Sequence, residues 1–242
     1  ALPIGWHSIL FPRVVRHSQI GKDGHPERGD FLPPIPLPRR MFAGKRTRIV
    51  GDEVKRLPTI KDVVIKQGRT GTMVFVTVNT DISSPRGVAI TEEQDIVYRE
   101  EPAKGAPPPE PQPAPGTAVW TKTVTPDPVM LFRYSALTFN GHKIHYDHPY
   151  SVESEAYPGL VVHGPLQASL LLNQAAALLG KTPARFEYRC LAPLIAGGTA
   201  EVRSWPEGEG ARGVILDPSG VATCEARAVR REEARAPETG SA

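Results

Sequence analysis

An apolar stretch that opens with Gly164 and Pro165 and ends at Gly180 constrains the fold of this chain more than any other segment. Proline at the first helical position and glycine just after the last one are typical of a helix with a defined start and stop. The leucines and alanines of the stretch are not confined to one stripe, so we expect the helix to be buried. At about 16 residues and roughly 1.5 Å each, it is too short to span a membrane.

Histidines cluster directly before this helix. Four of the chain's seven histidines are His142, His145, His148 and His163. A helix N-terminus favours negative charge and an imidazole exchanges protons near neutral pH, so the arrangement predicts a site that stabilises negative charge beside a proton carrier. We expect no metal, because the H-x-x-H-x-D-H spacing lacks the i, i+4 pair typical of helical zinc sites.

Other segments show alternation or β-branched residues between Gly/Pro turns, which is typical of strands. The predicted strands cover residues 62–66, 72–79, 88–99, 184–191, 199–205, 213–217 and 221–229. Residues 132–137 are interpreted as either a short helix or a short strand leading into the histidine segment.

The histidine segment resembles the active-site region of the MaoC-like, R-specific enoyl-thioester hydratases and dehydratases of the hotdog fold. Residues 138–147 read T-F-N-G-H-K-I-H-Y-D and are followed by Tyr150 and by His163-Gly164. The family pattern is approximately S-G-D-x-N-P-I-H-x-D, and later an H-G opens the central helix. This variant is similar to a subgroup that contains mesaconyl-C4-CoA hydratase and mitochondrial-type 3-hydroxyacyl-thioester dehydratase. Stretches of the N-terminal half, such as DGHPERGDFLPPIPLPRRMFAGKR, share the resemblance.

The resemblance implies an α+β double hotdog, in which an antiparallel sheet wraps a central helix. Residues 1–100 would form the first half, and residues 117–230 the second, catalytic half. No helical pattern is apparent in the first half, so we expect it to lack a central helix of its own. Proline-dense residues 101–116 are interpreted as a semi-rigid linker, and the charged residues 231–242 as a disordered tail.

The resemblance also implies catalytic roles. Hydration of an unsaturated thioester needs a group that takes a proton from water and donors that hold the developing enolate oxygen. His145 falls on the catalytic histidine, and we expect it to act as the base with a pKa near the ordinary value of about 6.5. The backbone N–H of Gly164 would hold the oxyanion. Asn140 replaces the usual aspartate; an amide cannot act as a base, but it can orient the water.

Three neighbouring residues have alternative roles. His142 either assists catalysis or fixes the loop. Asp147 is a candidate for orienting the imidazole or contacting substrate, and a turn-forming role through hydrogen bonds to the backbone is the alternative. His163 either contacts substrate or caps the helix that follows it.

Arginines of the basic stretch 33–48 are candidates for binding an anion. Arg39 and Arg40 could pair with CoA phosphates or with the free carboxylate of a dicarboxylic acyl group, because the planar guanidinium forms two hydrogen bonds with either. A solvated basic loop is the alternative. The expected activity is therefore hydration of an enoyl-CoA thioester, with mesaconyl-C4-CoA to citramalyl-CoA as the best guess. A 3-hydroxyacyl-ACP or acyl-CoA dehydratase and a non-catalytic acyl-binding hotdog subunit are the alternatives.

Composition limits the remaining classes. The net charge of +3 is mild and no basic patch carries interleaved aromatics, so we expect no nucleic-acid partner. The two cysteines are interpreted as buried thiols in a reducing compartment. With no signal peptide, spanning segment or lipidation motif apparent, we expect a cytoplasmic protein without a membrane partner. No cofactor is expected beyond the CoA of the substrate. The halves can pair within one chain, and a homodimer is the other arrangement that the resemblance allows.

Overall fold

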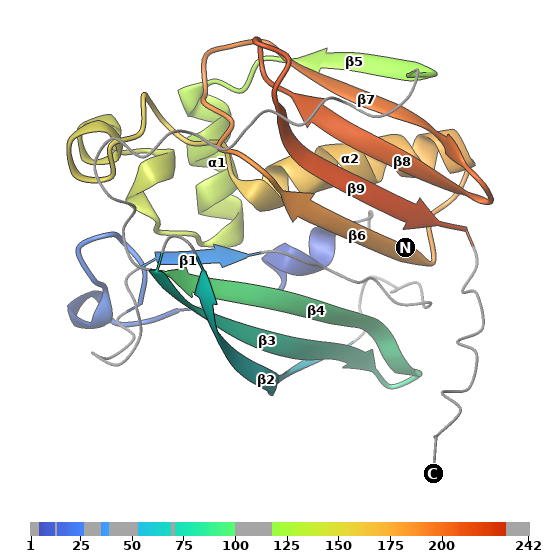
Figure 1. Cartoon of the computed structure of the whole chain (residues 1–242). Coiled ribbons are helices and arrows are strands. Elements are labelled where there is room, and N and C mark those ends of the chain that lie inside the picture. The colour runs from blue at the N-terminus through green and yellow to red at the C-terminus, as the bar shows by residue number, and fades with distance from the viewer. Residues whose placement is uncertain are drawn as a thin grey trace.

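Two antiparallel sheets organise the computed structural model of this chain, which describes residues 5–12, 14–26, 35–38, 53–68, 71–99 and 118–230 (Figure 1). The first sheet has the order β1-β4-β3-β2 and comprises β1 (Ile35–Pro38), β2 (Lys55–Gly68), β3 (Gly71–Ser84) and β4 (Gly87–Arg99). The second has the order β5-β7-β8-β9-β6 and comprises β5 (Trp120–Val124), β6 (Arg185–Cys190), β7 (Ala200–Glu207), β8 (Gly210–Leu216) and β9 (Ala222–Val229).

The predicted central helix is confirmed as α2 (Gly164–Leu179), which lies across one face of the five-stranded sheet (Figure 1). It ends where Gly180 adopts the left-handed conformation, with φ of 68°. Leu171 is only 2% exposed and packs so close to β8 that a Cβ on Gly213 would lie 2.9 Å from its Cδ2 atom. The helix is not buried all round, since Asn173 and Ala177 face solvent.

The other helices and strands predicted for the second half are of the types expected from the sequence. Residues 132–137 belong to a helix, α1 (Pro128–Thr138), whose N-terminus is capped by Asp127 through a 2.7 Å hydrogen bond from the Met130 amide. Every predicted strand is present, and β7, β8 and β9 form the expected antiparallel run. The edge strand β6 pairs with β9, which closes the sheet over the helix.

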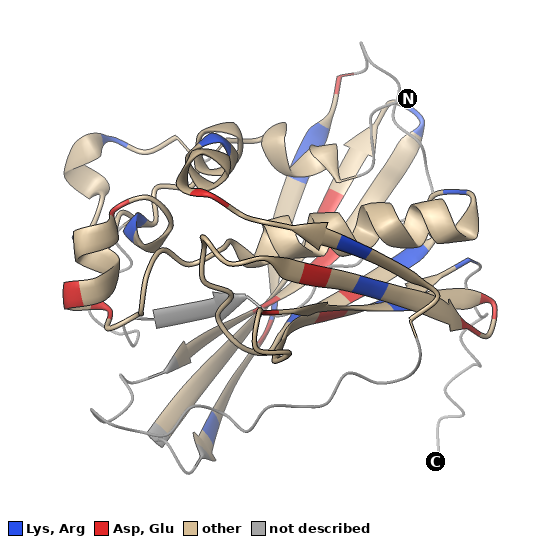
Figure 2. Ribbon diagram, turned by 90° about the horizontal axis from the view of Figure 1, so that it is seen from above, with Lys and Arg blue, Asp and Glu red and all other residues tan. Residues whose placement is uncertain are grey.

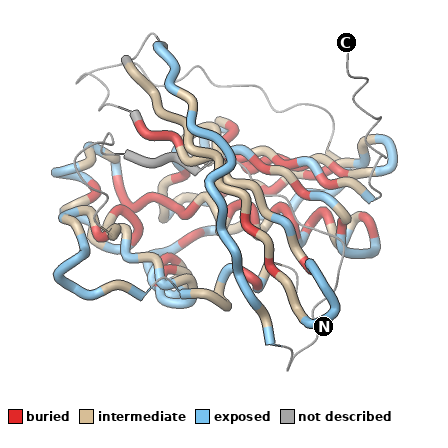
Figure 3. The backbone as a smooth tube through the Cα atoms, turned by 90° about the horizontal axis from the view of Figure 1, so that it is seen from below, coloured by how far each residue is buried: buried red, intermediate tan, exposed pale blue. Residues whose placement is uncertain are grey.

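The first half contains a sheet and short 3-10 helices. Among its described residues, the helical elements are η1 (Trp6–Ile9) and η2 (His17–Gln19). The expected lack of a central helix in this half stays a prediction. The outer strand β2 is exposed along its length (Figure 3) and presents apolar side chains to solvent, including Leu57 and Ile65. The inner strands bury Ile82 and Val97. The predicted linker and tail, residues 101–116 and 231–242, lie outside the described residues.

Charged side chains are spread over both sheets in the described part of the chain, with acidic and basic residues interspersed (Figure 2). No helix among the described residues is long and apolar enough to cross a membrane.

Shortening Leu171 to alanine should lower the free energy of unfolding by about 2–5 kcal/mol, because the truncation leaves a cavity between α2 and the sheet. Chemical denaturation monitored by circular dichroism measures this value. Asn173→Ala, on the exposed side of the same helix, should stay within about 0.5 kcal/mol of the parent chain. Similar losses in both variants would contradict the packing described above.

Candidate active site

The loop that follows α1 presents the histidines. Phe139 ends the helix in the left-handed conformation, with φ of 54°. The side-chain oxygen of Asn140 then accepts a 3.0 Å hydrogen bond from the backbone N–H of His142. A short 3-10 helix, η3 (Lys143–His145), follows. The Asn140 oxygen therefore helps to form the turn, and its second lone pair and the amide nitrogen are the parts of this side chain suited to orient a water.

His145 is oriented by a backbone carbonyl. The ring is 7% exposed, and its Nδ1 donates a 2.7 Å hydrogen bond to the carbonyl oxygen of Val161. In the neutral ring, Nε2 is then the atom with the free lone pair, as a general base requires. Neither His142 nor Asp147, the orienting residues suggested by the sequence, makes this bond.

The expected pKa of His145 was wrong. The pKa of His145 is lowered to about 4. Burial is the largest cause, and the charge of His25 lowers the pKa as well, while the hydrogen bond to Val161 partly offsets both effects. Burial could not be inferred from the sequence, because the histidine lies in a polar segment. The neutral, proton-accepting form of His145 therefore prevails at neutral pH.

His163 stacks on His145. The two ring centroids lie 3.6 Å apart at an interplanar angle of 19°, and His163 is 1% exposed. Its Nε2 forms a 2.8 Å hydrogen bond with the Ser135 hydroxyl of α1. Burial, together with the charges of His145 and His142, holds the pKa of His163 well below its usual range. His163 is thus a neutral platform for the His145 ring, and the prediction that it contacts substrate stays a prediction.

Gly164 occupies the first position of α2, immediately after His163. The first N–H groups of a helix have no partner within the helix, so they are suited to hold an oxyanion. A Cβ at this position would lie 2.7 Å from the Cys190 sulfur, so a larger residue would push the helix start away from β6. The oxyanion role of Gly164 stays a prediction.

Asp147 stabilises the segment after η3. Its carboxylate accepts a 3.1 Å hydrogen bond from the Tyr150 backbone N–H, and the Asp147 amide donates to the Lys143 carbonyl at 2.8 Å. These bonds correspond to the turn-forming alternative. His148 is exposed, while Arg39 and Arg40 lie outside the described residues.

Two residues of the N-terminal segment, Asp23 and His25, also belong to this site, and neither was predicted from the sequence. The backbone carbonyl of Asp23 accepts a 2.9 Å hydrogen bond from the Lys143 amide. His25 donates from its Nδ1 to the Asp23 carboxylate at 3.0 Å, and its ring lies 4.1 Å from that of His142. Within the described part of the chain, donor atoms of Asp23, His25 and His142 lie within 4.8 Å of one another, close enough to share a metal ion.

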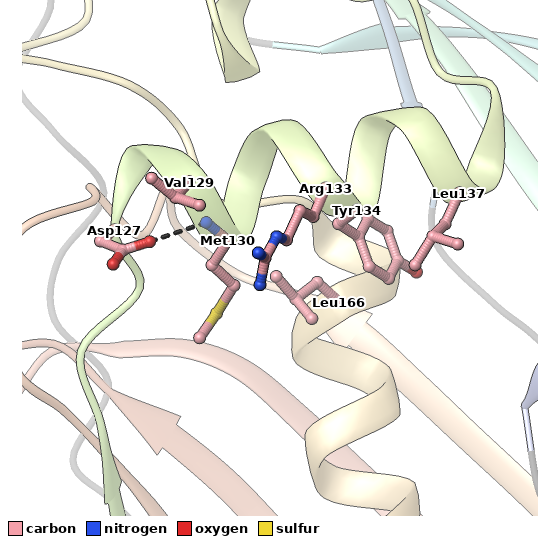
Figure 4. A pocket seen from close by; sticks show the side chains of 7 residues that line it. All are labelled: Asp127, Val129, Met130, Arg133, Tyr134, Leu137 and Leu166. Carbon is pink, nitrogen blue, oxygen red and sulfur yellow. Dashed lines mark hydrogen bonds between the residues drawn. The ribbon is translucent and has the colours of Figure 1, made fainter.

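An open groove lies between α1 and the start of α2 (Figure 4). Its volume is about 360 Å³. Tyr134 connects the groove to the site, because its ring centroid lies 4.8 Å from that of His163. The lining is largely apolar and includes one cation, Arg133; the other lining residues are Asp127, Val129, Met130, Leu137 and Leu166.

We expect His145 to titrate near its pKa of about 4, followed by NMR of labelled histidines. Its pKa in the unfolded chain is about 6.5, so the unfolded state binds the proton more readily. The stability contributed by the neutral ring is therefore complete above pH ~6.5 and is lost as the pH falls toward about 4. The His145→Gln variant assigns the resonance. A His145 resonance that titrates near pH ~6.5 would rule out this burial effect.

Comparison with known proteins identifies the family of this chain. The family model for hydroxyacyl-thioester dehydratase type 2 matches residues 5–196. The chain is 46% identical over 216 residues to mesaconyl-C(4)-CoA hydratase of Chloroflexus aurantiacus, covering 86% of this chain and 76% of that protein. It is 46% identical over 72 residues to the mitochondrial hydroxyacyl-thioester dehydratase type 2 of Schizosaccharomyces pombe, covering 28% and 24% of the two chains.

Among solved structures, a Mycobacterium tuberculosis protein with a double hotdog fold superimposes with a TM-score of 0.52 at 15% identity. The match covers 80% of this chain and 74% of that one, and at this identity it shows the fold alone. The α+β double hotdog architecture is thus confirmed. Because the family model spans more than half of the sequence, this chain belongs to the hydroxyacyl-thioester dehydratase type 2 family.

Proposed function

We propose that this protein is a hydratase that adds water reversibly across the double bond of an enoyl-CoA thioester, with mesaconyl-C4-CoA as substrate and citramalyl-CoA as product. The observation that carries the proposal is the hydrogen bond between His145 Nδ1 and the Val161 carbonyl, which leaves Nε2 of a neutral ring as a proton acceptor. The extensive identity to mesaconyl-C(4)-CoA hydratase supports this choice of substrate.

The reaction follows from the geometry of His145 and the start of α2. His145 takes one proton from water while the water oxygen bonds to Cβ of the substrate. The electron pair of the double bond moves toward the thioester oxygen, which the N–H of Gly164 holds as a developing oxyanion. A second proton carrier then gives a proton to Cα, the thioester carbonyl re-forms, and the proton on His145 passes to that carrier. The reverse sequence dehydrates a 3-hydroxyacyl thioester.

A dehydratase of longer acyl thioesters is a second candidate, favoured by one observation. The groove beside Tyr134 is open and mostly apolar, as an extended acyl chain requires. For this candidate, the acyl chain is carried either by CoA or by acyl carrier protein. Turnover of a medium-chain 3-hydroxyacyl thioester above that of a C4-dicarboxylyl thioester would favour it.

The remaining properties are part of the same proposal. No cofactor is required, because histidines and backbone donors suffice for the proton transfers and the oxyanion. Cys190 and Cys224 face each other across β6 and β9 as thiols and not as a disulfide, which supports a reducing, cytoplasmic environment. The exposed apolar side chains of β2 support a homodimer.

His145→Ala should lower kcat by about 10²–10⁴-fold, because the group that accepts the proton from water is lost. The measurement is hydration of mesaconyl-CoA followed by loss of enoyl absorbance. His148→Ala, an exposed histidine three positions further on, is the matched control and should retain activity. Circular dichroism checks the fold of both variants. Near-normal turnover in a folded His145→Ala chain would remove His145 from the mechanism.

Replacing Arg39 or Arg40 with methionine should weaken turnover of mesaconyl-CoA far more than that of crotonyl-CoA, which lacks the free carboxylate. An unpaired carboxylate in an apolar pocket is costly, and a charged hydrogen bond contributes roughly 1.5–3 kcal/mol, so a selectivity change of about 10- to 150-fold is expected. Arg16→Met, at an exposed position, is the control. An equal loss on both substrates would instead indicate binding of CoA phosphates.

A further inference from the structure

The segment that contains Asp23 and His25 is joined to the catalytic loop through the backbone. Gly24 is buried, with φ of +89°, and a Cβ there would lie 1.8 Å from the carbonyl oxygen of Gly141. The Asp23 carbonyl also accepts a hydrogen bond from the Lys143 amide at 2.9 Å. Any side chain at position 24 would separate the two segments. The first half of the chain thereby places Asp23 and His25 beside the histidines of the second half.

The Asp23 and His25 side chains form a fixed pair. The Asp23 carboxylate accepts hydrogen bonds from both the backbone N–H and the Nδ1 of His25, each at 3.0 Å. In the neutral ring, this hydrogen bond selects the tautomer that leaves Nε2 of His25 as an acceptor. The His25 ring packs at 4.1 Å against His142, which in turn lies edge-on to His145 with 5.4 Å between centroids.

Among the described carboxylates of this site, Asp23 is the one that accepts a hydrogen bond from a histidine side chain. Asn140 carries no charge and its oxygen caps the turn, while the carboxylate of Asp147 accepts from the Tyr150 backbone. Burial acts to raise the pKa of Asp23, but the hydrogen bonds from His25 and the charges of His25 and His142 outweigh it, so the pKa lies well below its usual range. Asp23 is therefore an anion that attracts positive charge on the two rings.

We propose that Asp23 and His25 are a positioning pair for His142, which serves as the second proton carrier of the hydration reaction. The proposal rests on the proposed hydratase function and assigns to the first half of the chain a direct part in catalysis. It also explains how the site works without a titratable group at position 140. The carboxylate comes from the N-terminal segment instead, in close contact with the loop that carries both His142 and His145.

Proton transfer balances with two histidines. Neutral His145 accepts one proton from water as the hydroxyl oxygen bonds to Cβ, and protonated His142 gives one proton to Cα. One molecule of water has then been added, while His145 holds the extra proton. Transfer of this proton from His145 to His142 restores the starting state. The carboxylate of Asp23 compensates the positive charge whenever His142 carries the proton.

The test is kinetic and uses the whole chain. We expect Asp23→Asn to lower kcat for mesaconyl-CoA by at least about 10²-fold with little change in KM, because an amide can donate to His25 and invert its tautomer. Asp23→Glu should recover part of the rate, because it restores the carboxylate. In ¹⁵N NMR, the protonated nitrogen of His25 should move from Nδ1 to Nε2 in the Asn variant. His25→Asn should lose kcat in the same way, whereas His17→Asn, at an exposed position of the same N-terminal region, should not.

Three outcomes would overturn the proposal. Unchanged kcat in Asp23→Asn would show that the carboxylate has no part in the reaction. Parallel losses of activity and melting temperature in Asp23→Asn and Asp23→Glu would show that the pair only stabilises the fold. Loss of activity with a chelator and recovery with Zn²⁺ would make Asp23, His25 and His142 metal ligands instead. A parent chain that hydrates no enoyl-CoA would contradict the proposed hydratase function itself. An active parent chain with an equally active Asp23→Asn variant would contradict only the role of the pair.

Discussion

The hydrogen bond from His145 to the Val161 carbonyl is the interaction on which the site depends. It fixes both the orientation and the tautomer of the ring. The position of the His145 ring therefore depends on how firmly the Val161 backbone is held. That residue is held on both sides: its amide donates to the Ile144 carbonyl, and it forms an isolated bridge with Ile195. The packing of α2 against the second sheet fixes His163 beside it. The core thereby controls the geometry of the His145 ring.

Burial determines which part each histidine can take. His145 and His163 are stacked and removed from water. A positive charge on either ring would be poorly solvated, and positive charges on both rings would repel each other. The pair is therefore suited to accept a proton during the reaction and not to hold one at rest. His142 and His25 are only partly buried and face an anion, Asp23. Groups in such different environments are suited to opposite acid and base roles.

The sequence predicts the local parts of this architecture well. Gly164, Pro165 and Gly180 mark the ends of α2 because helix termini have strict local requirements, and the strands of both halves follow from alternation. Long-range features are different. The approach of Asp23 to Lys143 and the use of the Val161 carbonyl depend on packing between distant segments. The pKa of His145 was misjudged for the same reason, since burial is a property of the assembled fold.

The contact between Gly24 and Gly141 bears on why the two halves share one chain. Its backbone atoms approach so closely that neither glycine tolerates a side chain, so the interface has to form in one register. Covalent linkage makes that docking intramolecular and raises the effective concentration of the N-terminal segment at the site. The second half carries the proposed base and the start of α2. Among the described residues of this site, the carboxylate that is hydrogen-bonded to a histidine side chain, Asp23, comes from the first half. A half that has no described α-helix can therefore still be required for the chemistry, as the part that brings negative charge to a cluster of histidines.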